Sequence, residues 1–214
     1  MNAGTFVARG PPARGRRAPF QGGAMSGGPT IRLQPHEVAF LRGGSRAAVT
    51  VAVVALHLRG EVRTWRPGTV RTVGVAAGAG ALPRLTKAVH SALYRPAGMR
   101  ELLGRRGVGE ALGELRGDLV AAGLLRRVPP RRTRAARVLL RSLRVELPLP
   151  AGREGVSSDD VLLAVALYGD KALGSLVPRF AGAAGLIGRG GVADEGLPQF
   201  WGGGSGGGFT CGAV

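Results

Sequence analysis

The sequence has one cysteine, Cys211, and three histidines, so few of the residues that bind metals or act as nucleophiles are present. A single cysteine excludes an internal disulfide. His36, His57 and His90 lie far apart in the chain, and neither an HxH nor an HxxxH pair occurs. No zinc site of ordinary ligand spacing can be assembled from these residues. We therefore predict no cofactor and no metal site, and a structural or surface role for each histidine.

Aromatic residues and long apolar runs are also scarce. Aromatics make up 5% of the chain and hydrophobic residues 44%, so the core must be built from Leu, Val and Ala. The longest apolar run, residues 47–58, is interrupted by Thr50 and His57. As a helix it spans about 18 Å, short of the roughly 30 Å of a bilayer core. Residues 1–24 lack the apolar stretch of a signal peptide. We expect a cytoplasmic protein with neither a signal peptide nor a transmembrane helix.

Positive charge is what the sequence has in excess. It carries 30 basic and 13 acidic residues, a formal net charge of +17. All the basic residues except Lys87 and Lys171 are arginine. With abundant Ala and Gly, this preference is typical of codon bias in a GC-rich genome, so part of the charge is mutational in origin. The other interpretation is an anionic partner, either nucleic acid or a lipid surface, and net charge alone leaves both open.

The first half of the chain has the pattern of a winged-helix-like domain, expected at residues 30–128. Residues 1–29 are basic and without periodicity, and we expect them to be disordered, with Met25 as an alternative start. Pro35 is suited to the first position of a helix, and Gly43-Gly44 interrupts that helix before a second one over residues 46–59. Polar and apolar residues then alternate over 61–65 and over 69–73, on either side of a turn at Pro67-Gly68, and this pattern predicts a β-hairpin.

A similar order recurs further on, so we expect up to two units, at residues 30–75 and 81–128. Helices are predicted from residue 83, over 99–103 and over 109–122, followed by an extended segment at 124–128. The predicted fold class is mainly α with short β-hairpins (α+β).

The remainder is predicted to be a basic helix with a linker (129–157), a C-terminal helical segment (158–180) and a flexible Gly-rich tail (181–214). Pro148 and Pro150 open the linker, and Ser158 is a candidate cap of the last helix, with Asp159 and Asp160 in its first turn. Cys211 in the tail is either an inert thiol or a modified or reactive one.

The strongest candidate contact is a run of arginines without an acidic residue between positions 126 and 144. On a helix over residues 133–145, four of them fall within about 80° of arc, which predicts a basic amphipathic helix. Three interpretations compete: a solvated helix whose apolar side packs on the domain, a membrane-surface helix whose Leu/Val side meets the acyl boundary, and a nucleic-acid contact. No aromatic residue lies in the stretch to stack on bases. The candidate residues are Arg126, Arg127, Arg131, Arg132, Arg134, Arg137, Arg141 and Arg144.

Specific DNA readout by the second helix is not expected, because residues 46–59 contain neither Asn nor Gln. Its Ala/Val-rich composition suits a protein partner better. No catalytic constellation is present either. The Ser and Asp residues at 157–160 are explained as a helix cap, and the Gly-rich residues 104–109 lack the ending of a phosphate loop. We expect no enzymatic activity and no small-molecule substrate.

Residues 33–44 read LQPHEVAFLRGG, which fits the pattern L-x-P-x-E-x-A-x-L-x-G-G. This resembles the opening of an uncharacterised membrane-protein family of high-GC, actinobacterial-type bacteria with a Gly/Cys-rich tail. Shorter similarities follow at residues 119–125, 165–169, 172–173 and 178–181. The resemblance implies membrane association, but the family has no established activity to transfer.

Two departures from that family matter. Relatives carry a pair of transmembrane helices after the segment that matches Leu125, whereas arginines follow directly here, and the tail keeps one cysteine where relatives have several. We therefore predict a non-enzymatic interaction module that is peripheral at the cytoplasmic membrane surface and binds anionic lipid or a protein partner. The alternative is a winged-helix nucleic-acid-binding protein.

Overall fold

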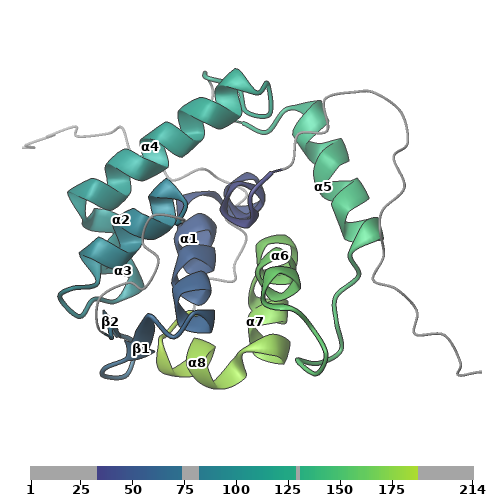
Figure 1. Ribbon diagram of the computed structural model, residues 1–214. Coiled ribbons are helices and arrows are strands. Elements are labelled where there is room, and N and C mark those ends of the chain that lie inside the picture. The colour runs from purple at the N-terminus through teal and green to yellow at the C-terminus, as the bar shows by residue number, and fades with distance from the viewer. Residues whose placement is uncertain (1–32, 74–81, 129–130, 188–214) are drawn as a thin grey trace, which may run out of the picture. The chain divides into compact units, whose positions relative to one another are not determined.

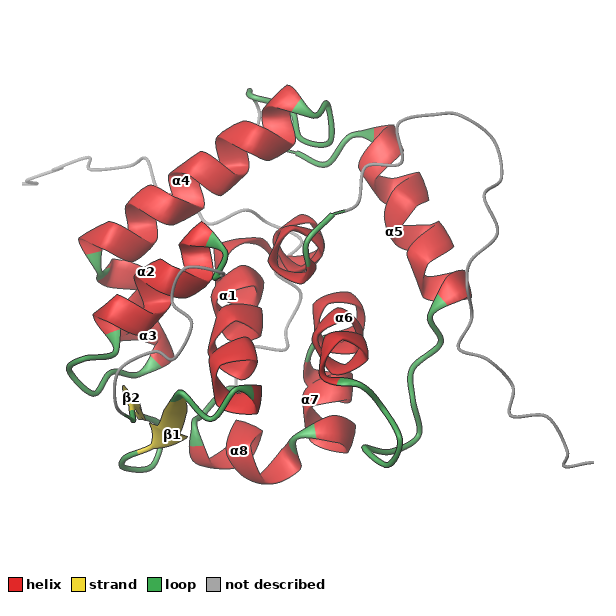
Figure 2. Ribbon diagram, in the orientation of Figure 1, coloured by secondary structure: helices red, strands yellow, loops and turns green. Residues whose placement is uncertain are grey.

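The computed structural model describes residues 33–73, 82–128 and 131–187, and this part of the chain is mainly helical, with one small antiparallel sheet (Figures 1 and 2). The mainly α class predicted from the sequence is confirmed. The elements, in chain order, are α1 (Pro35–Leu58), β1 (Val62–Thr64), β2 (Val70–Thr72), α2 (Arg84–Ala92), α3 (Met99–Gly104), α4 (Arg106–Ala121), α5 (Arg134–Glu146), α6 (Ser158–Tyr168), α7 (Asp170–Leu176) and α8 (Pro178–Ala183).

Helix α1 begins and bends where the sequence indicated. Pro35 occupies its first turn, and the Glu37 carboxylate accepts a hydrogen bond of 2.6 Å from the Gln34 amide as part of a capping box. Gly43 (φ −144°) and Gly44 (φ 66°, ψ −157°) leave helical geometry and kink the helix. Because only glycine adopts the Gly44 conformation readily, the predicted interruption at this pair is a backbone requirement.

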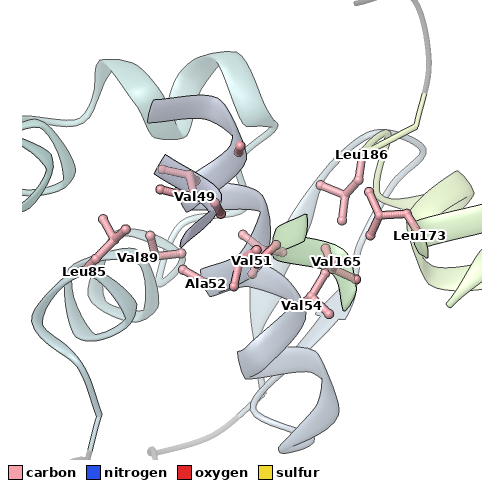
Figure 3. Close-up of a cluster of buried hydrophobic side chains, with 14 of the residues drawn as sticks. Val49, Val51, Ala52, Val54, Leu85, Val89, Val165, Leu173 and Leu186 are labelled. Carbon is pink, nitrogen blue, oxygen red and sulfur yellow. The ribbon is translucent and has the colours of Figure 1, made fainter. Parts of the chain in front are cut away.

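The half of α1 after the kink forms the centre of the core. Residues 47–54 and Leu56 are buried, and α2, α3 and α6 pack around them. Figure 3 shows four α1 side chains, Val49, Val51, Ala52 and Val54, meeting residues that come from α2, α6, α7 and the chain after α8. This helix is the one that a winged-helix protein would insert into a DNA groove. Most side chains in this half of α1 are buried, which opposes such a role.

By length and hydropathy α1 is also the one helix among the described residues that could span a membrane. It is longer than the apolar run 47–58 because helix continues on both sides of the glycine pair. A buried core helix meets the same criterion, and most of the α1 apolar window is buried by the other helices.

The predicted hairpin is present, with Val62 opposite Thr72, Arg63 opposite Arg71 and Thr64 opposite Val70. Val62 and Val70 are buried against the helices, so the alternate residues face outward. The free edge of β2 is covered in part by the segment after α2, since Val70 and Ala97 exchange two hydrogen bonds of 3.0 Å.

The helices of the second expected unit are confirmed as α2, α3 and α4, but the extended segment predicted after them builds no strand of a sheet. Residues 124–128 make a single isolated bridge, between Leu125 and Arg132, and no second sheet occurs in residues 33–73, 82–128 and 131–187. Two neighbouring prolines, Pro129 and Pro130, follow the segment, and they lack the N–H groups a ladder needs.

The C-terminal helices complete the hydrophobic core that surrounds α1. Helix α6 packs along α1 and is its most extensive partner. Its cap is Ser157, whose hydroxyl accepts a hydrogen bond of 3.1 Å from the Asp160 amide, so the expectation that Ser158 caps the helix was wrong by one residue.

The boundary of the Gly-rich tail was also placed too early. Helix α8 runs to Ala183, and Ala184 and Leu186 are buried in the core. Gly185 lets this segment approach the hairpin turn, because a Cβ there would lie 3.1 Å from the Gly68 Cα. The part of the expected tail from residue 188 onward and the expected disordered residues 1–29 lie outside the described residues.

Candidate functional site

The arginine-rich segment folds as a short bridge followed by helix α5. Thr133 caps the helix, and its hydroxyl accepts from the Ala136 amide at 3.3 Å. The same hydroxyl donates to the Gly123 carbonyl at 2.9 Å, which ties the start of α5 to the end of α4. The predicted helix over residues 133–145 is confirmed, and one residue fixes both its first turn and its position.

One face of α5 packs on the protein. Ala136 and Leu140 are buried, and Leu139, Leu143 and Leu147 are partly buried against the core. Ala136, Leu140, Leu143 and Leu147 follow i, i+4, i+7 and i+11 spacing, which places them on one side of a helix. The leucine side of α5 is therefore covered by protein, as in the interpretation in which the apolar side packs on the domain, and it does not face outward to meet the acyl boundary of a membrane.

The opposite face of α5 carries alternating arginine and valine. Arg134, Val138, Arg141 and Val145 also follow i, i+4, i+7 and i+11 spacing. Val138 and Val145 are 55% and 79% exposed, and Val128, six residues before the helix begins, is 85% exposed. Single exposed valines are ordinary on protein surfaces, but Val138 and Val145 stand in one row with arginines.

All eight candidate arginines are exposed, and we call them the arginine surface: Arg126, Arg127, Arg131, Arg132, Arg134, Arg137, Arg141 and Arg144. The ion pairs found among the described residues use Arg59, Arg84, Arg105 and Arg106 instead. Within the described residues, the arginine surface thus presents positive charge that no carboxylate of the same molecule neutralises.

The far end of α5 is held by the C-terminus of α6. The Tyr168 hydroxyl donates to the carbonyl of Leu147 at 2.8 Å and contacts that of Arg144 at 3.1 Å. In return, Arg144 Nη2 donates to the Leu167 carbonyl at 3.4 Å. These bonds fix the rotation of α5 about its axis, and so decide which residues face outward.

A second arginine, Arg42 of α1, caps the same end of α6. Its Nε donates to the Ala166 carbonyl at 2.7 Å. Burial lowers the pKa of Arg42 below its usual value, Asp170 opposes that shift, and Arg144 and Arg132 lower the pKa further. A cation at a helix C-terminus interacts favourably with the helix dipole. Arg42 and Arg144 therefore help to hold α6, and Arg144 also belongs to the arginine surface.

Two of the three histidines, His57 and His36, have structural surroundings, and the third, His90, lies on α2 with its Nε2 buried. The His57 ring stacks on Phe180 of α8 with centroids 3.7 Å apart, and burial lowers its pKa. His36 is buried as well, and this burial lowers its pKa. In the described parts of the chain, no group of three or more His, Cys, Asp and Glu residues is placed to hold a metal ion. Cys211 lies outside the described residues.

No family model, curated protein or solved structure matches this chain. The resemblance to the actinobacterial-type membrane-protein family therefore stays a prediction. The membrane-surface interpretation placed Val138 and Val145 on the same side of the helix as the leucines, whereas the structure places them on the exposed side. Their spacing from Arg134 and Arg141 carried the signal.

Proposed function

We propose that the protein is a non-enzymatic, peripheral module that binds the anionic inner surface of the cytoplasmic membrane through the arginine surface. The observation that supports this proposal most strongly is the row Arg134–Val138–Arg141–Val145, which is exposed and free of ion pairs within the described residues. Guanidinium groups meet lipid phosphates, while small apolar side chains between them enter the headgroup layer.

The expected affinity is mainly electrostatic. A basic residue near an anionic leaflet contributes about 1 kcal/mol, and the attraction falls off within a Debye length of about 10 Å at 0.1 M salt. Two or three valines add little compared with a membrane-spanning helix. The proposal therefore predicts reversible binding that salt weakens.

Sedimentation with vesicles tests the proposal. The arginine-surface variant replaces Arg131, Arg134, Arg137 and Arg141 with Gln, and leaves Arg144 in place because Arg144 also contacts α6. A scattered control variant replaces four other exposed arginines that form no ion pair within the described residues, Arg46, Arg100, Arg116 and Arg179. Both variants lose the same formal charge.

The native chain and the control variant should sediment with vesicles that contain phosphatidylserine, and not with phosphatidylcholine alone. Loss of four surface arginines at about 1 kcal/mol each should weaken binding by about a thousandfold in the arginine-surface variant. Equal losses in the two variants would mean that net charge, rather than this surface, drives binding. Equal binding to both kinds of vesicle would refute the proposal.

The winged-helix-like interpretation of residues 33–73 belongs to a second proposal, nucleic-acid binding. The order helix, kink, helix, hairpin favours it, and the burial of α1 opposes groove entry by that helix. A gel shift with duplex DNA across a salt series tests the second proposal, because affinity should fall steeply with salt if several phosphates are contacted. A salt-sensitive shift that persists in the arginine-surface variant would support contact through residues 33–73, and no shift at low salt would end this proposal.

A further inference from the structure

The hairpin and the segment paired with its edge combine arginine with exposed aromatic rings, which the arginine surface lacks. Arg71 lies over the Trp65 ring, with its guanidinium carbon 4.3 Å from the ring centroid. Trp65 is 48% exposed, and Tyr94, which lies within the segment after α2 that covers β2, is 86% exposed. Both rings therefore remain accessible to a partner.

Positive charge gathers on this face, and residues 62–73 of the hairpin contain no acidic residue. Arg63 and Arg71 are directly opposite in the β1–β2 register, and Arg66 lies in the turn between the strands. Arg95 follows Tyr94. Like charges placed directly across a sheet are destabilising, so the fold retains a repulsive pair here. Glu61, the acidic residue that immediately precedes β1, is buried and paired with Arg59 at 2.9 Å, so it does not offset this charge.

The hairpin is held firmly from behind. The Gly68 amide donates to the Ala183 carbonyl at 2.8 Å, which links the turn to α8. A Cβ on Gly98 would lie 3.0 Å from the Gly68 carbonyl oxygen, so backbone also closes on the turn from another side. A face held in this way loses little conformational entropy when a partner binds.

We propose that the hairpin face, defined as Arg63, Trp65, Arg66, Arg71, Tyr94 and Arg95, binds single-stranded nucleic acid. Bases stack on the Trp65 and Tyr94 rings, and the arginines contact the phosphates that flank them. A membrane partner fits less well, because Val73 is the one large aliphatic side chain exposed on the hairpin within the described residues. This proposal is independent of lipid binding at α5, which lies apart from the hairpin in Figure 1.

Trp65 is also the probe for the test. Replacement of Trp201, the second tryptophan, with Phe in the full chain leaves Trp65 as the sole tryptophan emitter. Titration with oligothymidylate should quench its fluorescence. The logarithm of the binding constant should fall with the logarithm of salt concentration, with a slope of about −0.7 for each phosphate contacted.

Variants separate stacking from charge. Trp65→Ala should weaken binding by about fivefold to a hundredfold, measured by anisotropy of a labelled oligonucleotide, whereas Trp65→Phe should retain most of the affinity. Arg63→Gln with Arg71→Gln should make the salt slope shallower by about 1.4. The scattered control variant should change the Trp65 quenching little.

Three results would overturn the proposal. Equal affinity for polyphosphate and oligothymidylate would mean that the bases contribute nothing. Equal affinity for a duplex would mean that stacking on the rings is not required. Quenching by anionic vesicles without quenching by the oligonucleotide would assign the hairpin face to lipid.

Discussion

Replacement of Gly169 with Ala should destabilise the protein through Arg42. Gly169 lies between α6 and α7 with φ 61° and ψ −125°, a conformation that side chains disfavour. A Cβ at this position would lie 2.6 Å from Arg42 Nη1. The guanidinium can move away, but it then gives up the bond from its Nε to the Ala166 carbonyl.

The expected cost has two parts. The unfavourable backbone conformation costs about 1–3 kcal/mol. Loss of a hydrogen bond from a charged donor costs about 1.5–3 kcal/mol, and the lower end applies because Arg42 is partly exposed. We expect the free energy of unfolding to fall by about 3 kcal/mol in total, measured from the midpoint of urea unfolding at constant m.

Two further variants isolate the Arg42 part of that cost. Gly155 also has positive φ, 70°, but a Cβ there would meet nothing within 4 Å, so Gly155→Ala should cost only the backbone part. Arg42→Met should remove the part of the Gly169→Ala effect that depends on the guanidinium, so the two changes together should be less than additive. Equal costs for Gly169→Ala and Gly155→Ala, or full additivity with Arg42→Met, would refute the reasoning.

Three other predictions concern the histidines and the ends of α5. Burial lowers the folded-state pKa of His36 and His57 below 6.5. Between the folded-state and unfolded-state pKa values the unfolded chain therefore binds more protons than the folded one. Stability should fall as pH drops below 6.5 and level off below the folded-state pKa values. The double variant His36→Gln, His57→Gln should show a flatter profile in urea melts at several pH values, and an unchanged slope would count against this origin. Thr133→Ala should cost about 1 kcal/mol in thermal or urea unfolding, and Thr133→Ser should recover most of it, since the hydroxyl caps α5. Tyr168→Phe removes the donor to Leu147 and should speed amide hydrogen exchange in the last turn of α5, while α4 stays protected; equal protection of both helices would contradict that assignment.

Local backbone chemistry explains why most element boundaries could be predicted from the sequence. Gly43-Gly44, Pro67-Gly68 and Gly123 act through φ and ψ at their own positions, and each marks a kink, a turn or a helix end in the structure. The Thr133 cap and the helix that follows are equally local. These features need no knowledge of the rest of the fold.

The choice of packing partners could not be predicted in the same way. Periodicity shows that α1 is apolar, but it does not say that α6, more than a hundred positions later, is its main partner. The same holds for the rotation of α5. Val138 and Leu140 are both apolar, and only the contacts of Tyr168 and the core decide that the leucine is buried and the valine exposed. The exposure of the arginines could therefore be predicted from the sequence, whereas the identity of the apolar residues that face outward could not.

The most direct test of membrane binding by the arginine surface is a fluorophore placed within it. In a Cys211→Ser background, which removes the sole native thiol, an environment-sensitive label is attached at Val145→Cys on the outer face of α5, or at Gly117→Cys on the exposed side of α4. We expect a blue shift at position 145 with anionic vesicles, reversed by salt, and none at position 117. An unchanged spectrum at position 145, or the same shift at both positions, would contradict it.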